Sequence, residues 1–61
     1  MTSELELRER QKMHLASLLR VKKFSGQKIQ ILQDEILNVV VVMLEEDVAL
    51  VEKLLDVKAI D

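Results

Sequence analysis

The sequence has no cysteine and no proline, a single glycine and a single aromatic residue, Phe24. Without cysteine, the chain can form neither disulfide bonds nor thiolate metal sites. Its one histidine, His14, is too few for a multi-histidine metal site within one chain. A chain of 61 residues is marginal in stability and usually needs a disulfide, a metal or a partner chain. We therefore expect a well-packed helical core or self-association, and no cofactor.

The residues that build turns and strands are also scarce. Ser25-Gly26 is the only clear break signal, whereas a sheet needs several turns together with aromatic and β-branched side chains. Hydrophobic residues make up 49% of the chain and charged residues 33%, which is too apolar for a disordered chain and typical of amphipathic helices. The composition predicts an all-α protein that forms a single domain over residues 1–61.

A first helix is predicted over residues 3–24. Ser3 can cap its first turn, and Glu6 stands three residues later, which is the spacing of a capping box. Apolar residues are sparse before Met13 and dense after it, so we expect the first two turns to be solvated. A turn is predicted at residues 25–26, where Gly26 can adopt the left-handed conformation that ends helices.

A second, continuous helix is predicted over residues 27–58. Its apolar residues recur at spacings of three, four and seven, which is the period of an α-helix. Between residues 36 and 44 this helix is apolar on nearly all sides, which predicts burial on several sides. Two alternatives stay open. Four consecutive valines favour a strand by propensity, and a break at Glu45-Glu46-Asp47, with Asp47 as the cap, would give a three-helix arrangement.

The two predicted helices form an antiparallel hairpin whose second helix overhangs the first by roughly ten residues, given the rise of an α-helix. Apolar side chains of the overhang have nothing in their own chain to cover them, so we expect a homodimeric helical bundle. Residues 1–28 hold seven basic and three acidic residues, and residues 29–61 hold two and eight, which favours antiparallel pairing. The predicted oligomer interface comprises Ile29, Leu32, Ile36, Val40, Met43, Leu50, Val51, Leu54 and Leu55.

Basic residues on both sides of the turn form a candidate partner-binding site. They are Arg20, Lys22, Lys23 and Lys28. Such a cluster suits an acidic protein, an acidic membrane surface or a phosphate backbone, but a net charge of −2 argues against generic nucleic-acid affinity. Lysine and arginine at this place also complement the negative end of the first helix, which is the more common reason for them.

The sequence gives catalysis no support. His14 has no cysteine, aspartate or second histidine nearby, and Ser17 has no base placed to activate it. The carboxylates of Glu45-Glu46-Asp47 are more typical of a solvated helix face than of a metal site. A glycine-rich phosphate loop is absent as well. We expect a protein that is not an enzyme and has no catalytic, cofactor-binding or metal-binding residue.

The predicted layout resembles the Rop-type plasmid regulators, which are small dimeric chains of two helices and a short turn. That resemblance implies a nucleic-acid-binding regulator that uses basic residues of its first helix, and we keep it as the alternative. The leading hypothesis is a homo-oligomeric protein–protein interaction module, such as an adaptor, a regulator or an assembly subunit. A peripheral membrane or coat-assembly element is the third.

Cellular location is predicted from three absences. The N-terminal residues 1–4 are acidic and have no apolar core, unlike a signal peptide. The longest uncharged apolar stretch, residues 36–44, is far shorter than the ~20 residues that span a membrane. Together with the absence of cysteine, these features predict a cytoplasmic protein without a membrane span.

Overall fold

The computed structural model describes residues 3–25 and 30–60, and in this part of the chain the regular elements are three α-helices without any strand. These are α1 (Glu4–Ser25), α2 (Gln30–Val40) and α3 (Glu45–Leu55). The predicted all-α class is confirmed, and the strand alternative for the valines is wrong. Gly26, Lys28 and Ile29 lie outside the described residues, and Ser25, the other residue of the predicted turn, is the last residue of α1.

Helix α1 begins where the sequence predicts. The backbone N–H of Glu6 donates a hydrogen bond of 3.1 Å to Oγ of Ser3, which confirms Ser3 as the cap. The first two turns are solvated, as expected, since Leu5 and Leu7 are both exposed. Packing begins further along α1, where the buried residues are Leu15, Leu18 and Leu19.

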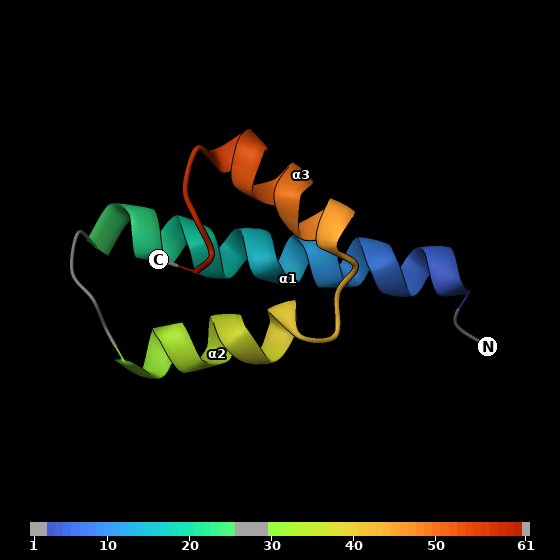
Figure 1. Cartoon of the computed structure of the whole chain (residues 1–61), viewed down its shortest axis with the longest axis horizontal. Helices are drawn as coiled ribbons and strands as arrows, with labels where there is room; N and C mark the ends of the chain where they lie inside the picture. The colour runs from blue at the N-terminus through green and yellow to red at the C-terminus, as the bar shows by residue number, and fades with distance from the viewer. Residues whose placement is uncertain (1–2, 26–29, 61) are drawn as a thin grey trace.

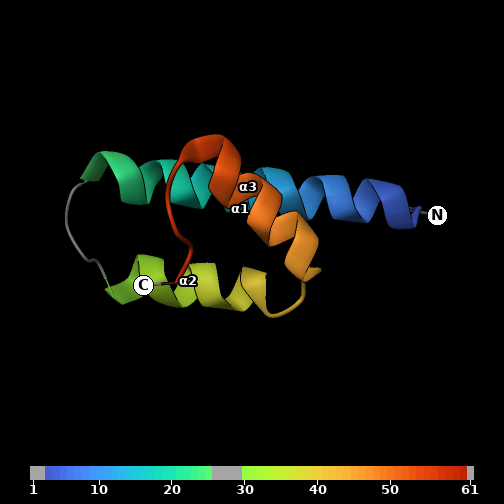
Figure 2. The same cartoon turned by 45° about the horizontal axis from the view of Figure 1, so that its top comes forward.

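The long helix α1 is the scaffold on which both shorter helices pack (Figure 1). Helix α2 runs antiparallel to α1, whereas α3 crosses α1 while running in roughly the same direction, as both views show (Figures 1 and 2). The core lies between α1 and these two helices. Its buried apolar residues are Leu15, Leu18, Leu19, Leu32, Ile36, Met43, Val51 and Ala59.

The predicted continuous helix over residues 27–58 is wrong, because the chain leaves helical geometry between Val40 and Glu45. The amides of Val42 and Met43 donate to carbonyls three residues back, at 3.2 and 3.1 Å, which tightens the end of α2. Leu44 is then extended, with φ −72° and ψ 142°. The break turns α3 back onto α1, where burial of Val51 offsets the loss of helical hydrogen bonds.

The three-helix alternative is therefore the arrangement that the structure adopts, but the break lies a few residues earlier than predicted. Leu44 occupies the cap position of α3 and makes no side-chain capping hydrogen bond. Asp47 does not cap the helix as expected; it lies inside the first turn. Burial at the break also differs from the prediction, since Val41 is 73% exposed and Val42 is 64% exposed.

Most residues of the predicted oligomer interface are used within the single chain. Leu32, Ile36, Met43 and Val51 are buried in the core, while Val40 and Leu55 pack against it and are partly buried. Leu50 and Leu54 remain exposed. The homodimeric bundle that would pair these residues between chains stays a prediction.

A short tail after α3 returns to the core. Asp56 adopts the left-handed conformation, with φ 54° and ψ 48°, and the amide of Val57 then donates to the Glu52 carbonyl at 3.2 Å. This hydrogen bond is the one that ends a helix in a Schellman motif. Ala59 follows and is buried, with its amide donating to Oε2 of Glu52 at 2.7 Å.

Candidate functional site

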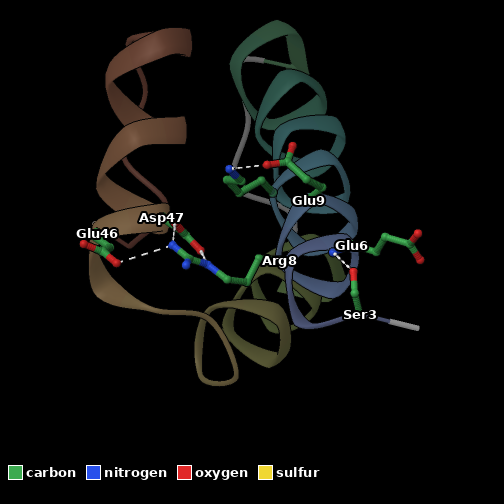
Figure 3. A network of polar contacts seen from close by, with 7 residues as sticks. Ser3, Glu6, Arg8, Glu9, Glu46 and Asp47 are labelled. Carbon is green, nitrogen blue, oxygen red and sulfur yellow. Dashed lines mark hydrogen bonds and ion pairs between the residues drawn. The ribbon is translucent and has the colours of Figure 1, made fainter. Parts of the chain in front are cut away.

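Helix α3 is fastened to α1 at its beginning by an ion pair (Figure 3). Nε and Nη2 of Arg8 donate to the two carboxylate oxygens of Asp47 at 3.0 and 2.9 Å, and Nη2 also lies 3.4 Å from Glu46. Asp47 is only 4% exposed. The hydrogen bonds from Arg8 lower the pKa of the Asp47 carboxyl below its ordinary value, and those to Asp47 raise the pKa of Arg8. Both groups are thus held in their charged forms.

The other end of α3 is fastened by two lysines of the predicted partner-binding cluster. Nζ of Lys23 donates to the carbonyl of Leu55, in the last turn of α3, at 2.8 Å. Nζ of Lys22 donates to the carbonyls of Lys58 and Ala59 in the tail, at 2.9 and 3.4 Å. Cations at the end of a helix complement its negative dipole end. Lys22 and Lys23 lie in the last turn of α1, as the sequence suggested, and they also contact the end of α3 and the tail that follows it.

A groove of about 420 Å³ lies between α1 and α3. Its size is within the range of sites that take a ligand or several bulky side chains. Exposed apolar side chains project beside it from both helices, namely Met13 of α1 and Leu50 and Leu54 of α3. The full set of lining residues is Glu9, Lys12, Met13, Ala16, Arg20, Leu50, Val51, Leu54 and Leu55. We call this feature the α1–α3 groove.

The α1 wall of the groove is one helical stripe. The stripe consists of Glu9, Met13, Ala16 and Arg20. Their spacings of four, three and four place them on one side of the helix. An acid stands at one end of the stripe and a base at the other, with a large and a small apolar residue between. Glu9 is also paired with Lys12, whose Nζ lies 2.8 Å from Oε1.

The structure brings together only part of what the sequence singled out. Arg20 lies in the groove with Leu50 and Leu54, whereas Lys22 and Lys23 face the end of α3. Sequence reasoning missed Glu9, Met13 and Ala16 as surface residues, although their heptad-like spacing could have revealed them. It also missed the Arg8–Asp47 pair, for which no local pattern exists.

Over residues 3–25 and 30–60, no group of three or more His, Asp or Glu side chains is placed to hold a metal ion. His14 and Ser17 are exposed on α1. None of the described helices combines the length and the apolar character that crossing a membrane requires. The α1–α3 groove is the candidate site among the described residues.

No family model matches the chain, and no curated protein or solved structure is significantly similar to it.

Proposed function

We propose that the protein is a non-enzymatic, self-associating helical interaction module, and that two copies pair through the α1–α3 groove. The observation that supports this proposal is the groove itself: an open, apolar surface with charged residues of both signs at its edges. A contiguous exposed apolar patch rimmed by polar residues is typical of protein–protein interfaces.

A second copy of the chain fits the chemistry of the groove. In a dimer with two-fold symmetry, the same patch of each chain faces its counterpart. If the two α1 stripes run antiparallel, Glu9 of each copy faces Arg20 of the other, and Met13 faces Ala16. Opposite charges then meet at both ends, and a bulky side chain meets a small one in the middle. Such charge pairs add little affinity, but they select the orientation.

Burial of the exposed apolar side chains provides the driving force. Covering a Leu or Met side chain completely contributes about 1.5–3 kcal/mol. Met13, Leu50 and Leu54 would each be covered twice in a symmetric dimer, once in each copy. Their summed contribution is comparable to the roughly 4–15 kcal/mol that association costs in lost freedom of motion. We therefore expect a dimer that dissociates on dilution.

A matched pair of substitutions tests the groove. Leu54 on α3 and Ile31 on α2 are both 73% exposed, but only Leu54 lines the groove. Leu54→Glu should shift the protein to monomer, whereas Ile31→Glu should leave its mass unchanged, as measured by sedimentation over a hundredfold concentration range. A wild-type protein that stays monomeric throughout, with a Tm independent of concentration, would exclude self-association.

The nucleic-acid-binding alternative receives less support from the described residues than from the sequence. Lys22 and Lys23 donate to backbone carbonyls of the same chain, so binding a phosphate would require them to give up these hydrogen bonds. Without them, Arg20 is the described member of the cluster that remains on an open surface. A continuous basic stripe, which phosphate binding needs, is therefore not supported.

A further inference from the structure

The connection between α2 and α3 is a loop, although its residue types are those of a helix. The connection consists of Val41, Val42, Met43 and Leu44 and contains no glycine or proline. No side-chain hydrogen bond caps α3, the helix that follows. A hydrogen bond from Nε2 of Gln11 to the Val42 carbonyl holds this connection to α1, and at 3.5 Å it is long. The loop conformation is thus imposed by the packing of α3 and is not encoded locally.

Straightening the connection would gather exposed apolar residues on one face. Leu37, Val41 and Leu44 are spaced by four and three residues, so they form one stripe if residues 41–44 become helical. In the closed chain all three are exposed. The amides of Asp47 and Val48 already donate to the Leu44 carbonyl. In a straightened chain the amides of Glu45 and Glu46 would also gain carbonyl partners, which replaces the missing side-chain cap.

The contacts that hold α3 do not require it to belong to the same chain. Helix α3 packs mainly on α1, through the Arg8–Asp47 pair at one end and the bond from Lys23 to Leu55 at the other. A second copy presents the same α1 surface. The connection of four residues is also short, and short connections invite the exchange of an element between copies.

We propose that two copies of the chain exchange α3: residues 41–44 become helical, α2 and α3 join into one helix, and each α3 packs on α1 of the other copy. This exchange goes beyond pairing through the groove, because it uses the connection and the stripe of Leu37, Val41 and Leu44. The grooves survive it, each being built from α1 of one copy and α3 of the other.

The ion pair at the start of α3 provides the test. Arg8→Asp places two acids in contact, and Asp47→Arg places two bases in contact, so each variant alone is mismatched whether or not it exchanges. An equimolar mixture, annealed by heating and slow cooling, can restore matched pairs only by exchange. The Tm of the mixture should then lie roughly 4–8 °C above that of either variant. This is the shift that about 1 kcal/mol in the free energy of unfolding produces in a domain of this size. If a variant alone does not fold, the mixture should regain helical circular dichroism.

Two controls keep the result specific. Lys53→Asp and Glu35→Arg make the same charge changes at exposed sites that have no ion pair among the described residues, and their mixture should melt as its components do. The double variant Arg8→Asp/Asp47→Arg holds a reversed pair within one chain. Its Tm is the value that the mixture should approach if exchange restores every ion pair.

A proline at the start of α3 should block the exchange without harming the closed chain. Glu45 is the first residue of α3, where proline is well accepted, and Leu44 before it is already extended. Within a joined helix the same proline would remove a hydrogen bond and clash with the preceding turn. Adding Glu45→Pro to both charge variants should abolish the rise in Tm, whereas adding Glu45→Ala should preserve it.

The outcomes separate exchange from groove pairing. A rise in the charge-variant mixture that Glu45→Pro removes supports exchange through a joined helix. A mixture that melts like its separate components overturns exchange, even if the wild-type protein forms a groove-paired dimer, because groove pairing leaves each ion pair within its own chain. A rise that persists with Glu45→Pro overturns the joined helix.

Discussion

Arg8 and Asp47 are 39 positions apart in the chain, yet the guanidinium of one meets the carboxylate of the other through paired hydrogen bonds of 3.0 and 2.9 Å. Two hydrogen bonds that run side by side between the same two groups fix both the distance and the rotation of α3 relative to α1. It holds α3 where its groove-lining residues stand beside Met13 and Ala16.

The pair makes the stability of the closed chain depend on pH. The pKa of Asp47 is lowered in the folded protein from an ordinary value of 3.8, so the stability it contributes is fully present above that value. The contribution is lost as the pH falls below 3.8 through the lower pKa of the folded state. The Tm of wild-type protein should therefore exceed that of Asp47→Asn at neutral pH, and the difference should shrink in strong acid.

Both proteins carry the same other carboxylates, so the difference in Tm isolates the contribution of Asp47. Calorimetric melts between neutrality and strong acid would measure it. A difference in Tm that is constant across the whole range would mean that the ionised pair does not stabilise the fold.

A core substitution should unfold most of the protein. Leu19 is fully buried, and Leu19→Ala should cost about 2–5 kcal/mol in the free energy of unfolding. A single core in a chain this small rarely supplies more than about 3–5 kcal/mol. Urea titration followed by circular dichroism would measure the loss. Ile31→Ala, at an exposed position of α2, should stay within about 0.5 kcal/mol of wild type; an equal loss in both variants would mean that the core is misplaced.

The left-handed residue after α3 offers a stabilising change. Asp56 has a positive φ of 54°, which costs energy in any residue with a Cβ atom. Asp56→Gly should raise the free energy of unfolding by about 0.5–1 kcal/mol, and Asp56→Val should lower it. Urea midpoints of the two variants should lie on opposite sides of wild type. The reverse order would show that the chain does not turn at this residue.

Glu45→Pro should also stabilise the closed chain by itself. Proline restricts the unfolded chain, and at a compatible site this contributes about 0.4–1 kcal/mol. Position 45 is compatible because Leu44 has ψ 142°, a value that residues before proline favour. The measurement is the Tm at high dilution, where association does not contribute. A lower Tm than that of Glu45→Ala would show that helix continues through residues 41–44 in the single chain.

Local patterns in the sequence were sufficient for the first helix. The Ser3 cap, the solvated first turns and the dense apolar stripe after Met13 depend on neighbours within a few residues. Such features are determined by hydrogen bonding and periodicity along one helix, and the structure confirms the cap and the solvated first turns. The apolar stripe is confirmed only in part, because Leu15, Leu18 and Leu19 are buried whereas Val21 and Phe24 are exposed.

The second half of the chain could not be predicted in the same way. Its helical period continues through Val41 and Leu44 without a glycine or proline, so local energetics favour one long helix. The break arises from packing: a continuous helix would extend past α1, whereas a broken one returns Val51 to the core. Contacts such as Arg8 with Asp47 join distant residues and leave no trace in spacing. The candidate groove depends on this return, so the sequence identified Leu50 and Leu54 as exposed apolar residues without locating their neighbours.

Ala59 lies outside every helix, yet it is held by all three. Its amide donates to Glu52 of α3, and its carbonyl accepts from Gln33 of α2 and Lys22 of α1. The residue is also 1% exposed, so water does not reach its amide in the folded chain. In hydrogen–deuterium exchange, this amide of an irregular tail should therefore be among the slowest in the protein. Its rate reports the free energy needed to release the tail from the three helices.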